Sequence, residues 1–321
     1  MAHSAIEWCD VSWNPVTGCR HGCPYCYAQK IARRFCGNVK ANKLLAGEPQ
    51  EGNHYLKDPV RGEDGKIIIY PFAFEPTFHE YRLNEIEKYK GGKNIFVGSM
   101  ADMFGSWVPE EWILKVFRKA AEVPKHNYIF LTKNPDRLCE LANKDLLPKG
   151  SNFWYGTTIT RKRHGRFEGG LSYNTFVSIE PVMEDLDMGI GSLGSCKWVI
   201  IGAETGARKE KVVPDKRWID NILDAASITQ VPVFMKDSLV PIMGEENMRR
   251  EFPEELLEHE LGDKAAKRLM ARCRICKETY PKKEMYAIIS KRRQGTTLFH
   301  LCDSCYQSFM DWSDEDNLPR F

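Results

Sequence analysis

Short apolar runs alternate with amphipathic stretches along most of the chain. The apolar runs predict strands at residues 6–13, 94–98, 128–131, 153–159, 175–179, 198–202 and, interrupted by Pro232, 231–235. Apolar positions at helical spacing predict helices at residues 27–35, 79–89, 135–142 and 215–226, and after Pro109. Strands that alternate with helices indicate parallel βαβ units. We therefore expect an α/β fold, an incomplete parallel (β/α)6-type barrel, with a doubly wound sheet as the alternative.

Changes in composition divide the chain into segments. Residues 1–244 are expected to form the partial barrel, with an insertion at about 37–92 that includes a hairpin near 62–69. Residues 161–174 show no apolar helical face, so we expect a loop there. A charged helical linker is predicted at 245–268, a small four-cysteine module at 269–310, and an acidic tail at 311–321.

Composition and charge exclude several classes of protein. The chain has 321 residues, 42% of them hydrophobic and 28% charged, which is ordinary for a globular protein. It has no apolar run of about 18 residues and no signal-peptide pattern at the N-terminus. We therefore expect a cytoplasmic protein without a membrane partner. Lys and Arg number 46 and Asp and Glu 44, so overall charge predicts no partner.

The chain contains 11 cysteines, and seven of them fall into two clusters. Without a secretion signal, closely spaced cysteines favour metal sites over disulfides. The first cluster is Cys19, Cys23 and Cys26, three thiols within a single loop. Three cysteines leave one iron of a four-iron cluster without a protein ligand, and that iron can bind a substrate or cofactor. The alternative, a zinc loop, needs a fourth ligand, for which His21, Cys9 and Cys36 are the candidates.

The Cys-x3-Cys-x2-Cys spacing, with Tyr25 before the last cysteine, resembles the radical S-adenosylmethionine superfamily. The resemblance implies that Cys19, Cys23 and Cys26 hold a 4Fe–4S cluster and that Tyr25 packs near the adenine of S-adenosyl-L-methionine. It also implies reductive cleavage of that cofactor to a 5′-deoxyadenosyl radical, which abstracts hydrogen from a substrate. An electron donor such as flavodoxin or ferredoxin would supply the electron.

Further stretches resemble an uncharacterised family of radical-SAM-like phage and bacterial proteins. The matching stretches, within roughly residues 5–240, are 6–19, 76–79, 97–104, 131–135, 177–181 and 199–206. The short link at 161–174 departs from the family pattern. This resemblance implies a phage or bacterial protein located in the bacterial cytoplasm.

Polar residues follow the predicted strands at the ends where barrel chemistry gathers. Ser99 and Asp102 follow the second strand, where the superfamily binds the cofactor's amino group, and Thr157 and Thr158 lie where it contacts ribose. Glu204 is a further candidate for cofactor binding. Glu180 and Lys236 are candidate catalytic residues at the ends of the fifth and last strands. Each of these side chains could instead be a helix cap or a solvated loop residue.

The second cluster consists of two Cys-x2-Cys pairs, Cys273 with Cys276 and Cys302 with Cys305. Two such pairs complete a tetrahedral four-thiolate site, which predicts structural Zn²⁺ in a zinc-ribbon-like module; an auxiliary iron–sulfur cluster is the alternative. Strands of a hairpin are expected at 286–289 and 297–299. A module of this size has too small a core to fold readily without a metal.

The four-cysteine module is strongly basic. Residues 264–310 contain eleven Lys and Arg but only three Asp and Glu, interleaved with aromatic residues, which suits phosphate contact and base stacking. The basic residues could also be a solvated face or bind a protein. We therefore expect a radical enzyme of nucleic-acid base modification or repair, with a DNA or RNA substrate. The alternatives are radical modification of a protein or peptide, and a non-catalytic zinc-dependent nucleic-acid-binding protein.

Overall fold

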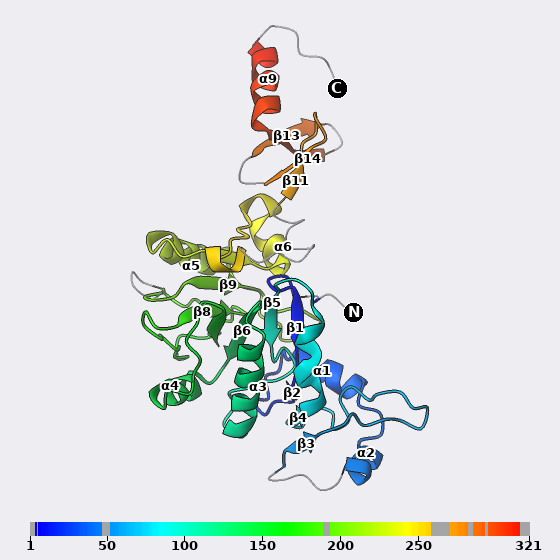
Figure 1. Ribbon diagram of the computed structural model, residues 1–321. Coiled ribbons are helices and arrows are strands. Elements are labelled where there is room, and N and C mark those ends of the chain that lie inside the picture. The colour runs from blue at the N-terminus through cyan, green and yellow to red at the C-terminus, as the bar shows by residue number, and fades with distance from the viewer. Residues whose placement is uncertain are drawn as a thin grey trace. The chain divides into compact units, whose positions relative to one another are not determined.

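The computed structural model describes residues 4, 6–46, 52–188, 193–257, 270–281, 285–292 and 295–314 (Figure 1). The chain divides into two compact units, Met1–Glu260 and Leu261–Phe321. None of the helices in the described ranges is long and apolar enough to cross a membrane.

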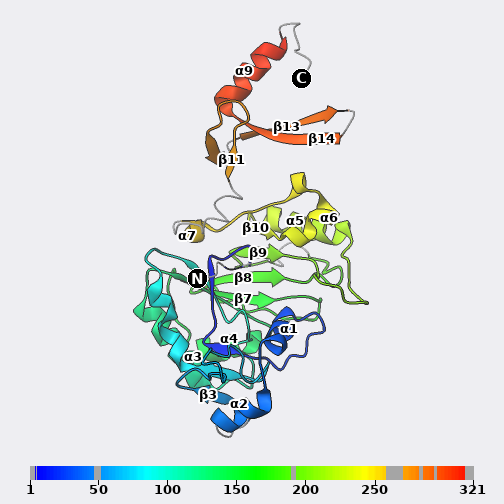
Figure 2. The ribbon, with the colours of Figure 1, turned by 90° about the vertical axis from the view of Figure 1, so that its right-hand side faces the viewer.

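The first unit is built on a parallel seven-stranded sheet in the order β1-β5-β6-β7-β8-β9-β10. The strands are β1 (Val11–Trp13), β5 (Asn94–Val97), β6 (Asn127–Thr132), β7 (Phe153–Thr158), β8 (Asn174–Ile179), β9 (Trp198–Ile201) and β10 (Val233–Met235). Figure 2 shows β7, β8 and β9 pointing the same way. The strand order follows the chain order without the reversal that defines a doubly wound sheet. The sheet curls into a half-barrel, which confirms the expected fold class.

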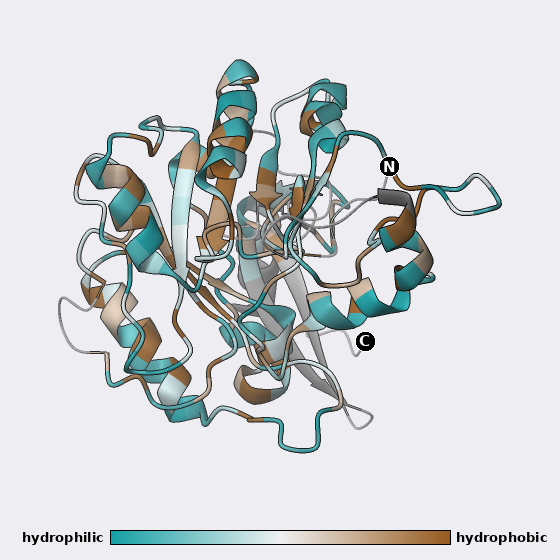
Figure 3. Ribbon diagram, turned by 90° about the horizontal axis from the view of Figure 1, so that it is seen from below, coloured by the Kyte–Doolittle hydropathy of each residue, from teal (hydrophilic) through white to brown (hydrophobic). Residues whose placement is uncertain are grey.

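Amphipathic helices pack against the sheet, and Figure 3 shows polar and apolar stretches along the helices. They are α3 (Glu110–Glu122), α4 (Pro135–Asn143) and α5 (Lys216–Ile228). The helix α1 (Tyr27–Arg34) follows the cysteine loop, and its buried residues are Ala28 and Ala32. α3 buries the apolar face predicted for it, including Trp112, Val116 and Phe117, against core residues of β5, β6 and β7. The link between β7 and β8 contains no helix, as its sequence predicts.

The first strand is shorter than predicted, because residues 6–10 leave the sheet. Trp8 is buried in this segment, with its ring centroid 4.7 Å from that of Phe96 and 6.1 Å from that of Trp198. Interior packing of a large aromatic side chain therefore takes the place of strand pairing.

The insertion adds a three-stranded sheet in the order β2-β4-β3. Its elements are α2 (Val39–Ala46), β3 (His54–Leu56), β4 (Thr77–His79) and the 3-10 helix η1 (Glu80–Lys88), and it pairs with β2 (Val16–Thr17). The predicted hairpin appears as a tight turn in which the Gly62 N–H donates to the Lys66 carbonyl at 2.9 Å.

The helix expected at 79–89 is present as the 3-10 helix η1 rather than as an α-helix. Two carbonyls of η1 accept hydrogen bonds from outside it: that of Arg82 from Trp13 Nε1 at 2.9 Å, and that of Ile86 from the His126 ring at 3.0 Å. Long-range side chains thus engage carbonyls that an α-helix would bond internally.

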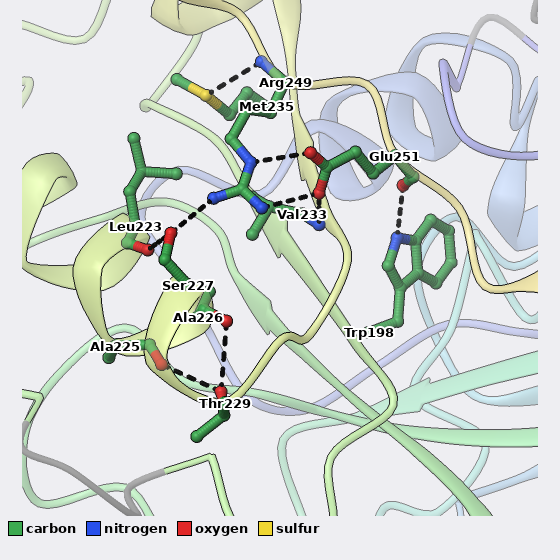
Figure 4. A network of polar contacts seen from close by, with 10 residues as sticks. All are labelled: Trp198, Leu223, Ala225, Ala226, Ser227, Thr229, Val233, Met235, Arg249 and Glu251. Atoms are coloured by element: carbon green, nitrogen blue, oxygen red, sulfur yellow. Dashed lines mark hydrogen bonds and ion pairs between the residues drawn. The ribbon is translucent and has the colours of Figure 1, made fainter. Parts of the chain in front are cut away.

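The segment predicted as a helical linker, residues 245–268, is not one continuous helix where the structure describes it. After η2 (Asp237–Leu239) and α6 (Val240–Met243), the described residues form only η3 (Glu245–Asn247) and α7 (Glu254–Leu257). Between these two helices, Arg250 forms an antiparallel bridge with Phe234 at the edge of β10. Figure 4 shows the neighbouring fork, in which the Arg249 guanidinium donates to Glu251 at 2.9 and 2.8 Å. Pairing with the sheet edge, which local patterning does not reveal, keeps this segment extended; residues 258–268 lie outside the described ranges.

The second unit contains two small hairpins and a helix. These are β11 (Met270–Arg272) with β12 (Thr279–Pro281), β13 (Met285–Arg292) with β14 (Gly295–Cys302), and α9 (Asp303–Asp314). The β13–β14 pair includes the predicted hairpin strands. α9 includes residues 311–314, which were expected to belong to the tail, and residues 315–321 lie outside the described ranges. The small core contains Cys273, Leu301 and Cys302.

Candidate functional site

A cavity of about 210 Å³ lies at the carboxyl ends of the parallel strands in the first unit. Most of the predicted site residues line it: Cys19, Cys23, Tyr25, Cys26, Ser99, Asp102, Thr158, Glu180, Glu204 and Lys236. Thr157 does not line the cavity; its hydroxyl accepts a hydrogen bond from the Phe167 N–H at 3.0 Å. The half-barrel therefore gathers at one edge polar residues that are up to 217 positions apart, Cys19 and Lys236.

The cysteine loop begins at a glycine that cannot be replaced without strain. Gly18 has a φ of +87°, and a Cβ there would lie 2.3 Å from the Glu75 carbonyl oxygen. Backbone hydrogen bonds from Gly18 to Met100 (2.9 Å) and from Cys19 to Phe74 (3.2 Å) hold the loop on both sides. The close approach of the Gly18 backbone to the Glu75 backbone thus fixes the position of the cysteine loop.

Backbone N–H groups point at two of the three sulfurs. Cys26 caps α1 and accepts from the Gln29 N–H at 3.4 Å, while the His21 N–H donates to Cys19 Sγ at 3.5 Å. Burial raises the pKa of the Cys19 thiol to about 12, so a bound cation would have to displace its proton.

The side chains that a zinc loop could recruit as a fourth ligand have other contacts. His21 Nε2 lies 2.7 Å from Asp102 Oδ2. The buried Cys9 thiol donates to Ser4 Oγ at 3.5 Å, and the Cys36 thiol donates to the Arg33 carbonyl at 3.1 Å.

Asp102 is a buried carboxylate that anchors the cysteine loop. In addition to His21, it accepts hydrogen bonds from Thr132 Oγ1 at 2.7 Å and from the N–H groups of Lys133 (2.8 Å) and Phe104 (3.1 Å). Burial on its own would raise the pKa of Asp102, but these hydrogen bonds outweigh burial and lower it. The expected contact between Asp102 and a cofactor stays a prediction, because protein groups already surround both carboxylate oxygens.

Ser99 and Tyr25 lie on the cavity wall near this anchor. The Ser99 hydroxyl donates to Asn14 Oδ1 at 3.2 Å, and that same oxygen accepts from the Met100 N–H at 2.9 Å. The Lys133 ammonium lies 6.0 Å from the centroid of the Tyr25 ring, at the limit of a cation–π contact.

Glu204 is buried and held by an arginine that the sequence analysis did not find. Arg208 donates to both Glu204 oxygens, from Nε and Nη2, at 2.7 Å each. These hydrogen bonds lower the pKa of Glu204. Arg208 lies in an irregular segment, so its spacing of four residues from Glu204 carried no helical signal.

Glu180 and Lys236 form an ion pair across the ends of β8 and β10. Gly202, at the end of the intervening β9, leaves room for it: a Cβ there would lie 3.1 Å from Lys236 Cδ and 3.2 Å from Glu180 Cγ. The two predicted catalytic candidates are therefore one unit, with both side chains at the cavity.

Two further cavity residues were missed by the sequence analysis. Trp8 Nε1 and Ser178 Oγ are buried and have no hydrogen-bond partner among the described residues. Ser178 lies in β8 and precedes Glu180, the first residue after the strand, by two positions; both line the cavity. A buried polar group without a partner is costly, so these two mark a wall that a polar ligand could satisfy.

The second unit holds a four-cysteine metal-binding site. The sulfurs of Cys273, Cys276, Cys302 and Cys305 all lie within 4.8 Å of one another, and those of Cys276 and Cys302 are 3.9 Å apart. Four thiolates at about 2.3 Å from one tetrahedral ion would be separated by about 3.8 Å. Burial would raise the pKa of Cys273, but backbone N–H groups of Cys302, Cys276 and Ile275 lower it to about 6. The backbone therefore favours the thiolate form at Cys273, whereas side-chain hydrogen bonds with Cys302, Cys273 and Cys276, together with burial, raise the pKa of Cys305 to about 12.

The fold and the site together define a parallel α/β half-barrel with a three-cysteine loop and a polar cavity at the carboxyl ends of its strands, joined to a four-cysteine unit. The chain belongs to the family described as "Protein of unknown function (DUF5131)", whose model matches residues 3–270. No curated protein matches the sequence.

Solved structures of spore photoproduct lyase are similar to the chain at low scores. A Cys-to-Ser mutant of that enzyme gives a TM-score of 0.38 at 11% identity, covering 97% of this chain and 74% of the other. The enzyme complexed with dinucleoside spore photoproduct gives 0.36 at 10% identity, covering 94% and 71%. Likeness at this level carries no argument about activity.

Proposed function

We propose that the first unit is a radical S-adenosylmethionine enzyme in which Cys19, Cys23 and Cys26 bind a 4Fe–4S cluster. The observation that carries the proposal is the position of the three thiols, on one loop at the wall of a cavity at the carboxyl ends of parallel strands. The Asp102 contact of His21 Nε2 also favours a three-cysteine set.

When bound, a reduced cluster with S-adenosyl-L-methionine supplies radical chemistry. The chain's own residues would bind and orient the cofactor and substrate. We assign Tyr25, Ser99 and Thr158 to cofactor contact because they line the cavity near the loop or on β7. Glu204, fixed by Arg208, and Asp102 would shape the same wall. Thr157 faces Phe167, so the proposed ribose contact is assigned to Thr158.

The Glu180–Lys236 pair, Ser178 and Trp8 are proposed to bind substrate or cofactor on the inner wall. Lys236 can donate three hydrogen bonds and Glu180 can only accept, so the pair offers both signs of charge to a ligand. Ser178 Oγ and Trp8 Nε1 would gain the partners that they lack.

We propose a nucleic-acid base as the substrate and Zn²⁺ as the metal of the second unit. Support for the base comes from exposed Lys and Arg in the loops after β7 and β9, including Arg163, Lys209 and Lys211. Arg161 and Arg166 in the first of these loops contact Glu184 and Glu168. The second unit also contains an aromatic pair, Tyr286 and Tyr306, whose ring centroids are 3.7 Å apart, and Tyr286 is exposed and so accessible to a base. The sulfur spacing supports zinc.

The test is metal analysis of anaerobically purified protein, followed by reduction with dithionite in the presence of S-adenosylmethionine. The proposal expects brown protein with about four irons and one zinc per chain, and formation of 5′-deoxyadenosine. Cys23→Ala should remove the iron alone, Cys276→Ala the zinc alone, and Cys139→Ala, on α4, neither. Colourless wild-type protein with two zincs would instead support a non-catalytic zinc protein.

The substrate part has its own test, salt-dependent binding of single-stranded and duplex DNA and RNA. Deleting the second unit or reversing Lys209 and Lys211 should weaken binding. Absence of binding at low salt would favour a protein or peptide substrate.

A further inference from the structure

Helix α1 presents its large apolar residues to solvent. Tyr27, Ile31 and Phe35 are 49%, 38% and 52% exposed, whereas the buried residues of the helix are the two alanines Ala28 and Ala32. This distribution is the reverse of an ordinary surface helix, which buries its large apolar side chains. Because the three residues are spaced four apart, they lie in one row along the helix.

Part of the insertion lies next to the end of α1. Ile68 Cδ1 lies 3.8 Å from where a Cβ on Gly37, just beyond α1, would stand. We call the surface formed by Tyr27, Ile31 and Phe35 the α1 patch; exposed rows of large apolar side chains of this kind mark interaction sites.

The segment of chain that contains α1 carries positive charge and no negative charge. Residues 11–47 include no Asp or Glu and six basic residues: Arg20, Lys30, Arg33, Arg34, Lys40 and Lys43. Lys43 is paired with Glu75 at 2.7 Å. Lys30, Arg33 and Arg34 belong to α1 itself and are exposed, so the apolar row is flanked by basic side chains. A partner that covers this surface should present acidic groups around an apolar centre.

The patch also lies directly beside the cysteine loop. α1 begins at Cys26, whose sulfur accepts the Gln29 N–H, and Tyr27 both lines the cavity and belongs to the exposed row. A protein docked on α1 would therefore approach the three thiols from outside without entering the cavity.

We propose that the α1 patch is the docking surface for an acidic electron-donor protein of the flavodoxin or ferredoxin type. The inference rests on the proposed function, because an electron donor is needed only if the cysteine loop holds a redox group. Each docking event transfers one electron and no atoms: the donor is oxidised by one electron and the acceptor at the loop is reduced by one. A nucleic acid would engage the basic side chains but leave the row of large apolar residues without a partner.

The test compares α1 variants of the full chain with matched variants on α5, using reduced and oxidised flavodoxin as the probe. The α1 variants are Lys30→Glu/Arg34→Glu and Ile31→Asp; the controls are Arg217→Glu and Ile228→Asp, where Ile228 is 59% exposed. Calorimetric binding of oxidised flavodoxin should weaken at least tenfold in the α1 variants and with added salt, but not in the controls. Formation of 5′-deoxyadenosine driven by reduced flavodoxin should fall by a similar factor, while formation driven by dithionite stays within about twofold of wild type.

The binding measurement tests the docking surface, and the dithionite reaction tests the proposed radical function. Equal flavodoxin affinity in the α1 variants and the wild type would overturn the docking surface, even if every variant cleaves the cofactor with dithionite. An absence of 5′-deoxyadenosine with dithionite in the wild type would overturn the proposed function and this inference with it. Iron content and visible absorbance of each variant show that a lost signal does not come from a misfolded loop.

Discussion

Replacing Asp102 should destabilise the first unit strongly, because its carboxylate accepts hydrogen bonds from three separate parts of the chain. In Asp102→Ala, the buried Thr132 hydroxyl and the N–H groups of Phe104 and Lys133 lose their acceptor. An unsatisfied buried donor costs about 1–3 kcal/mol, and breaking a buried charged network costs about 3–5 kcal/mol. The His21 contact is partly exposed and adds little to this figure. We expect Asp102→Ala to lose about 3–5 kcal/mol and the isosteric Asp102→Asn about 2 kcal/mol.

Urea unfolding followed by tryptophan fluorescence measures this loss in the full chain, because seven of the eight tryptophans lie in the first unit. With a urea dependence of about 2–3 kcal/mol per molar, the alanine variant should unfold at a urea concentration about 1–2.5 M lower. The control is Asp224→Asn on α5, an exposed position that should leave the midpoint unchanged. A loss below about 1 kcal/mol in Asp102→Ala, within the range of an ordinary surface substitution, would refute the assignment of Asp102 as the acceptor that satisfies these buried donors.

Three further predictions concern the other sites. Cys276→Ser should lose the zinc and the hydrogen-exchange protection of residues 270–314, because binding of the metal supplies the folding free energy of so small a unit. The melting of the first unit should not change. Equal protection with and without metal would contradict this. Hydrogen bonds from Arg208 lower the folded-state pKa of Glu204, so the ionised carboxylate stabilises the fold. This stabilisation is complete above the unfolded pKa of about 4.3 and is lost as pH falls through the folded pKa. The urea midpoint of Glu204→Gln should therefore depend less steeply on pH below about 4.3 than that of the wild type. Ser178→Ala removes a buried hydroxyl that has no hydrogen-bond partner among the described residues, so its urea midpoint should not fall and its free energy of unfolding should rise by up to about 1 kcal/mol. Equilibrium dialysis should show weaker binding of S-adenosylmethionine to this variant. A clear loss of stability would show that the hydroxyl is structural.

Local patterning predicted much of the framework. The buried face of α3, the short strands β8 and β9, and the helix-free link between β7 and β8 follow from apolar spacing within single segments. Both cysteine clusters could likewise be located because their ligands are close in sequence.

Pairing between distant segments could not be predicted. The 3-10 geometry of η1 depends on Trp13 and His126, and the extended segment around Arg250 depends on the edge of β10. Asp102, Glu180 and Glu204 were located at strand ends, but their partners His21, Lys236 and Arg208 were not identified as such. A single sequence contains the residues of such pairs but no signal of which residue meets which, so the electrostatics of the site needed the fold.

The segment that precedes β1 has a consequence for how the chain is made. Glu7 accepts a hydrogen bond from the Asp237 N–H at 2.8 Å, a contact between residues 230 positions apart, and also meets Arg250 at 3.2 Å. At a synthesis rate of about 5–20 residues per second, the first residues would wait roughly 10–50 seconds for this partner to leave the ribosome. Trp8, which borders Glu7, packs against both Phe96 and Trp198, and because Trp198 follows it by 190 positions its cover is completed almost as late. The segment before β1 therefore reaches its final contacts only after the last strand of the sheet has been made.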